Sequence, residues 1–211
     1  VLIYAVPAAR NLRLHAEQAE EIRTRTTTEE NVPLHTWTIL KKSKTAILNQ
    51  MYISILYGSF LSLLPYTLSA YKGDHKNTLL TWSTNIGVAF GAIGRLVTAK
   101  RSFRTRRLPL LSLLLTPLWI YLFGLCFVNK EFPPSYDAEM SLAPGIVSII
   151  VHGLFQFLYG YEDTLAYHRV AYDLDGTEIE LGTRYVGLFN QIGSFLGAFF
   201  SFGLTMAYFA A

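Results

Sequence analysis

The chain has 211 residues, of which 51% are hydrophobic and 16% are charged, and its formal net charge is +3. A soluble domain usually carries about 25% charged residues, so this composition argues against an ordinary soluble protein. The small net charge argues against a nucleic-acid partner, and the single cysteine, Cys126, excludes an internal disulfide and a cysteine-based metal site.

The first 44 residues predict a truncated helix followed by a long polar loop. Residues 1–9 are apolar and begin with Val1, and Arg10 follows rather than precedes them, which is the reverse of a signal peptide. We therefore expect 1–9 to be the end of a transmembrane helix, with an N-terminal half of the same chain before it. Residues 10–44 are rich in Thr, Glu and Arg and are predicted to be a cytoplasmic loop between two halves.

Residues 45–211 contain five apolar runs that are long enough to cross a membrane, since a spanning helix needs about 20 mostly apolar residues. A soluble helical bundle is the alternative, but its surface helices would show a polar stripe, and 108–128 shows none. The expected fold class is an all-α membrane protein, the five-helix C-terminal half of a major-facilitator-like transporter embedded in a lipid bilayer. The predicted spans are 45–70, 78–98, 108–128, 141–167 and 184–208.

Basic residues in the connecting segments predict the orientation, because Lys and Arg accumulate on the cytoplasmic side. Segments 10–44 and 99–107 hold seven and five basic residues, whereas 71–77 and 129–140 hold two and one. Segment 168–183 is assigned to the cytoplasmic side with the first two. The C-terminus is then expected outside, extracellular or lumenal, with the plasma membrane as the expected location.

Ionisable groups inside a span are costly and often functional. Glu162 and Asp163 stand near the predicted cytoplasmic end of the fourth span, and Arg95 stands near that end of the second. The two carboxylates could line a water-filled cavity, take up a proton or pair with Arg95, which makes all three candidates for gating or coupling. The alternatives are a span that ends at Tyr161, leaving both carboxylates at the interface, and an Arg95 that extends to it.

Two pairs of glycines have the four-residue spacing that lets helix backbones approach closely. Gly87 and Gly91 form one pair, and Gly193 and Gly197 form the other. We interpret both pairs as helix-packing positions. His152 and His168 lack a second ligand at metal spacing, and no catalytic triad, phosphate loop or HExxH element is present. No catalytic residue, metal or cofactor is predicted, and nothing in the sequence points to an enzyme.

The last predicted span carries Gln191-Ile-Gly-Ser-Phe-Leu-Gly-Ala198, which resembles the last helix of the eukaryotic riboflavin transporters. Leu64-Pro65, followed by Ser69, looks like that family's seventh helix. The resemblance implies an eleven-span solute carrier with an external C-terminus. Equilibrative nucleoside transporters are similar at Gly94-Arg95, and the battenins have a comparable tail.

The lead hypothesis is therefore transport of riboflavin or a similar neutral heterocycle by alternating access. Its ring would stack on tyrosines, and its polar edge would meet amides and hydroxyls. A nucleoside carrier and a non-transporting membrane regulator of the same fold remain the alternatives. The candidate substrate-binding residues are Asn49, Tyr52, Tyr66, Ser69, Asn85, Asn190, Gln191 and Ser194.

Overall fold

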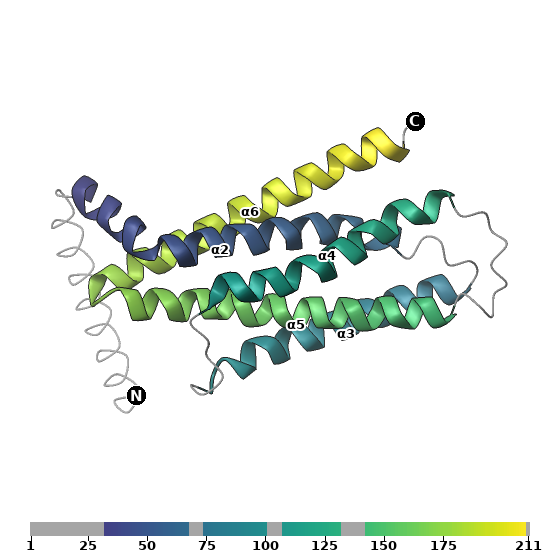
Figure 1. Ribbon diagram of the computed structural model, residues 1–211, viewed down its shortest axis with the longest axis horizontal. Helices are drawn as coiled ribbons and strands as arrows, with labels where there is room; N and C mark the ends of the chain where they lie inside the picture. Colours follow the sequence, from purple (N-terminus) through teal and green to yellow (C-terminus); the bar gives the residue numbers. More distant parts are fainter. Residues whose placement is uncertain (1–31, 68–73, 101–106, 132–141, 210–211) are drawn as a thin grey trace, which may run out of the picture. The chain divides into compact units, whose positions relative to one another are not determined.

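The computed structural model describes residues 32–67, 74–100, 107–131 and 142–209 (Figure 1). The chain divides into two units, Val1–Ile39 and Leu40–Ala211, and the packing described below is that of the second. The predicted helix end at 1–9 and most of the 10–44 loop lie outside the described residues. The helices are α2 (Val32–Thr67), α3 (Asp74–Val97), α4 (Leu108–Glu131), α5 (Leu142–Asp173) and α6 (Thr177–Phe209).

Proline marks the start of three of these helices. Pro33, Pro109 and Pro144 each stand in the first turn, of α2, α4 and α5 respectively. A proline is tolerated there because the first N–H groups of a helix have no partner within the helix. Pro117 lies inside α4, where it removes one backbone hydrogen bond.

Two helices extend well beyond the predicted membrane spans. Helix α2 begins at Val32, well before the predicted span start at Thr45 and inside the predicted loop, and α5 continues to Asp173 rather than ending at Tyr167. At 1.5 Å per residue, the 32 residues of α5 extend for about 48 Å, which exceeds the hydrocarbon thickness of about 30 Å. A helix need not end where it leaves the membrane.

The predicted 168–183 loop is reduced to a three-residue turn, Leu174–Gly176, between α5 and α6. Gly176 has a φ of +53°, a left-handed conformation that glycine adopts without steric cost. The last turns of α5 are supported by an ion pair between Arg169 and Asp173, 2.7 Å apart.

Within the part of the chain that the structure describes, three helices contain segments that are long and apolar enough to cross a membrane, at Thr36–Leu64, Leu108–Leu125 and Thr177–Ala207. An exposed apolar stripe follows α6 at intervals of three and four residues. It consists of Leu188, Ile192, Phe195, Phe199, Phe202 and Met206. A continuous apolar face of this kind is unusual in water and is expected against lipid, so the chain has the helices of an integral membrane protein.

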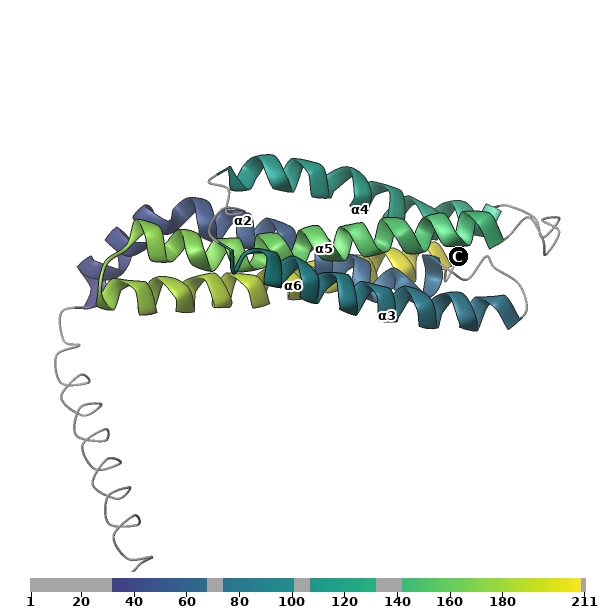
Figure 2. The same cartoon turned by 90° about the horizontal axis from the view of Figure 1, so that it is seen from below.

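Helix α5 packs against both α3 and α4, which lie on opposite sides of it (Figure 2). A buried cluster of aromatic and aliphatic side chains from α2, α4 and α5 includes Ile53, Phe60, Leu115 and Phe155. These helices form the frame that positions the polar groups described next.

Helices α2 and α6 approach at their backbones. A Cβ atom placed on Gly193 would lie 2.5 Å from the carbonyl oxygen of Met51, and one on Gly197 would lie 2.2 Å from that of Ile55. Helices α3 and α5 approach similarly, since a Cβ atom on Gly160 would lie 2.3 Å from the carbonyl oxygen of Gly91. The predicted pair Gly193 and Gly197 therefore lies at a close helix contact. In the other predicted pair, a Cβ atom on Gly91 would lie 3.6 Å from the Gln156 carbonyl oxygen, an ordinary contact, and one on Gly87 would lie 2.8 Å from the His152 ring.

Candidate functional site

Glu162 is enclosed between α2, α4 and α5, with none of its side chain exposed. The Oγ atom of Ser112 lies 2.7 Å from Glu162 Oε2 and also 2.7 Å from Asn49 Oδ1. Asn49 Nδ2 lies 3.3 Å from the same Glu162 Oε2. A buried carboxyl group is costly unless it is hydrogen-bonded. These contacts satisfy Glu162 Oε2 and link α2, α4 and α5 to one another.

Asp163, the next residue, has different partners. Its Oδ1 accepts a 2.8 Å hydrogen bond from Gln50 Nε2, and its Oδ2 lies 3.5 Å from Arg95 Nε. The Asp163 side chain is 15% exposed and that of Arg95 is 53% exposed, so solvent weakens the attraction between them. The sequence left three roles open for the two carboxylates. Asp163 adopts one of them, pairing with Arg95. Glu162, in contrast, is fully buried among side chains of α2 and α4.

The hydrogen bonds continue from α2 to α6. Gln50 Nε2 lies 3.4 Å from Ser54 Oγ, and Ser54 Oγ donates a 2.5 Å hydrogen bond to Asn190 Oδ1. All five described helices therefore contribute to one polar layer. The polar layer comprises Asn49, Gln50, Ser54, Arg95, Ser112, Glu162, Asp163 and Asn190.

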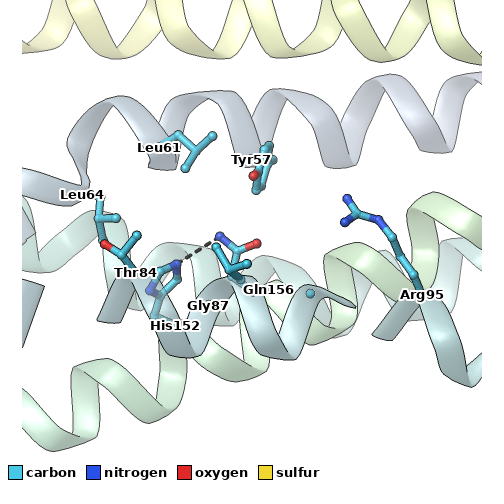
Figure 3. Close-up of a pocket in the computed structure, with 10 residues that line it drawn as sticks. Tyr57, Leu61, Leu64, Thr84, Gly87, Arg95, His152 and Gln156 are labelled. Carbon is cyan, nitrogen blue, oxygen red and sulfur yellow. Dashed lines mark hydrogen bonds between the residues drawn. The ribbon is translucent and has the colours of Figure 1, made fainter. Parts of the chain in front are cut away.

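A cavity of about 170 Å³ lies between α2, α3 and α5, and Figure 3 shows its lining. Arg95 stands at one end, while His152 and Gln156 lie on the α5 wall opposite Tyr57 and Leu61 of α2. Tyr57 stacks on Tyr159, with ring centroids 4.0 Å apart. The cavity thus combines aromatic and aliphatic walls with an amide, an imidazole and a guanidinium group.

His152 is held by side chains on both ring nitrogens. Its Nδ1 lies 2.7 Å from Ser83 Oγ, and its Nε2 lies 3.0 Å from Gln156 Nε2. In this orientation of the Gln156 amide, its nitrogen donates to His152 Nε2. The side chains of Ser83 and Gln156 thus contact both ring nitrogens.

A larger open groove of about 530 Å³ runs between α2 and α4. Its lining includes Lys44, Asn49, Tyr52, Ser112 and Thr116, and the Tyr52 hydroxyl and Thr116 Oγ1 are hydrogen-bonded at 2.7 Å. Asn49 and Ser112 also contact Glu162, so the groove reaches the polar layer.

The predicted substrate-binding residues lie in different parts of the described structure. Asn49 and Asn190 belong to the polar layer, and Tyr52 lies in the groove. Asn85 and Gln191 are exposed. The backbone of Ser194 packs against α2, since a Cβ atom on Gly58 would lie 2.2 Å from its carbonyl oxygen. The Tyr66 side chain and Ser69 lie outside the described residues.

Gln50, Ser112, His152 and Gln156 were not selected from the sequence as binding residues. Each is a polar residue within an apolar run, which is the same signal that selected Glu162. Gln156 contacts His152 on its own helix. The contacts of Gln50 to Asp163 and of Ser112 to Glu162 join different helices, at separations of 113 and 50 residues. Hydrophobic patterning within one helix does not reveal such pairs.

No family model, no curated protein and no solved structure matches this chain.

Proposed function

We propose that this chain belongs to a membrane carrier for a small neutral heterocyclic solute, with riboflavin as the lead substrate. The observation that supports this proposal is the polar layer, because hydrogen-bonding and charged groups inside membrane helices are costly and commonly lie on transport pathways. A purely structural bundle would need far fewer of them.

The cavity between α2, α3 and α5 is the proposed contact site for the solute. Its volume of about 170 Å³ is below the range of about 300–1,000 Å³ that is typical of complete ligand pockets. It would hold one ring of a flat heterocycle, stacked near Tyr57, with Gln156 and Arg95 at its polar edge. A facing half of the carrier would complete the site, as in two-lobed transporters whose sites lie between halves.

Uptake of radiolabelled riboflavin by cells that express the full-length protein tests this proposal, with unlabelled uridine as competitor. The carrier is expected to raise riboflavin uptake above that of control cells, and Gln156→Ala is expected to lower it at least tenfold. Glu180→Gln is the control, because Glu180 lies in an exposed ion pair with Arg184 and does not line the cavity, so it should leave uptake unchanged. Surface abundance of each variant is measured in parallel.

The same experiment separates the alternatives. Uridine uptake without riboflavin uptake would assign the protein to nucleoside transport. Absence of uptake of either solute, at normal surface abundance, would favour a membrane regulator that uses the fold without transport.

A further inference from the structure

Three side chains, those of Asn49, Ser112 and Glu162, form a closed ring of contacts. Ser112 Oγ is 2.7 Å from both Glu162 Oε2 and Asn49 Oδ1, and Asn49 Nδ2 is 3.3 Å from Glu162 Oε2. All three side chains are buried.

The hydrogens in this ring can be counted. A serine hydroxyl carries one hydrogen, whereas an ionised carboxylate and an amide oxygen carry none. If Glu162 were ionised, Ser112 could donate to only one of its two neighbours, and the other 2.7 Å contact would place two lone pairs together. If Oε2 carries a proton, Glu162 donates to Ser112, Ser112 donates to Asn49, and the Asn49 amide donates back to Glu162.

Exchanging the oxygen and nitrogen of the Asn49 amide, which their positions alone do not distinguish, changes the count. Asn49 would then donate to Ser112, Ser112 would donate to Glu162, and the Asn49 oxygen would face Glu162 Oε2 at 3.3 Å. That contact joins two acceptors unless a proton lies between them. In this orientation the assignment of a proton rests on that contact and on the second carboxyl oxygen.

The second oxygen of Glu162 supports this assignment. Oε1 is buried and has no hydrogen-bond partner among the described residues. A carboxylate would place part of its negative charge on that atom without compensation, whereas a carboxylic acid leaves a neutral carbonyl there. Asp163, by contrast, has a donor on each oxygen, from Gln50 and Arg95, as expected for an ionised group.

We propose that Glu162 is a proton-binding site, loaded through the groove between α2 and α4. Asn49 and Ser112 form part of the groove lining and also contact Glu162, so a proton can pass from water in the groove through Ser112 to Oε2. Among nearby charges, Lys44 of α2 lines the same groove, while Arg95 of α3 and Asp163 of α5 pair with each other. This inference does not depend on the identity of the transported solute or on transport itself.

Infrared spectroscopy of the full-length protein in lipid vesicles at neutral pH tests the proposal, because a protonated carboxylic acid absorbs apart from carboxylates. Wild-type protein is expected to show such a carbonyl band, and Glu162→Gln is expected to lack it. Asp163→Asn is the matched control and should retain the band. Gln at position 162 can donate to Ser112 as the acid does, so this variant should fold, as circular dichroism would verify.

Transfer to D₂O tests the route. The band is expected to shift as the carboxyl proton exchanges through the groove. A wild-type spectrum without the band, or a band that persists in Glu162→Gln, would overturn the assignment. A band that does not shift in D₂O would overturn the proposed access, and none of these outcomes depends on riboflavin uptake.

Discussion

Two adjacent carboxyl groups on α5 have opposite surroundings because consecutive helical residues point about 100° apart. Glu162 is enclosed by neutral side chains of α2 and α4, whereas Asp163 is directed toward an amide and a guanidinium group. The pair thus provides one group suited to hold a proton and one suited to hold a charge. Environments that separate two neighbouring acids in this way commonly assign them different roles.

Asp163→Asn should destabilise the bundle, because it weakens the ion pair to Arg95 and the charge-assisted hydrogen bond from Gln50. We expect a loss of about 1–2 kcal/mol, discounted for the exposure of Arg95. Reversible unfolding in mixed micelles measures it. Arg184→Gln is the control, because the Arg184–Glu180 pair is mostly exposed and should contribute no more than about 0.5 kcal/mol. If both substitutions lowered the free energy of unfolding equally, the contacts of Asp163 would contribute no more to stability than an exposed ion pair.

At the scale of helices, the sequence predicts which segments are helical far better than which side chains meet. Apolar runs locate all five described helices, and the spacing of Gly193 and Gly197 predicts a close helix contact on α6 without identifying its partner, α2. The extensions of α2 and α5 are missed because hydropathy reports the boundary of the lipid rather than the end of a helix. The polar layer is only partly predicted. Ser112 is a single serine in an apolar run, and its contacts with Asn49 and Glu162 are formed only when other helices pack beside it.

The contact between α2 and α6 gives a prediction for a single methyl group. Gly197→Ala would place Cβ 2.2 Å from the Ile55 carbonyl oxygen and 2.7 Å from the Ser59 nitrogen, and rigid backbone cannot move aside as a side chain could. We expect a loss of about 1–3 kcal/mol, measured by unfolding in mixed micelles.

Gly203→Ala, on the same helix, provides the control. A Cβ atom at Gly203 meets nothing within 4 Å, so the higher helix propensity of alanine should leave stability unchanged or raise it by up to about 1 kcal/mol. Similar losses for both substitutions would show that α2 and α6 do not pack as described.

For the molecule as a whole, the apolar stripe on α6 indicates that this face contacts lipid. Phe199 is 68% exposed and lies within the apolar segment of α6. Phe199→Lys should therefore reduce membrane insertion of that segment, because a lysine near the centre of a spanning helix costs about 2.5–3.5 kcal/mol. Glycosylation-mapped insertion measures this effect, and Phe199→Leu should insert normally. Equal insertion of both variants would place α6 in water rather than lipid.

The three-residue connection between α5 and α6 has a mechanical consequence. Residues 174–176 are too few to absorb a large displacement, so any tilt of α5 must carry the start of α6 with it. The two helices would then move together as one unit. Helix α2, which is joined to both by the polar layer, would lie at the pivot of that motion.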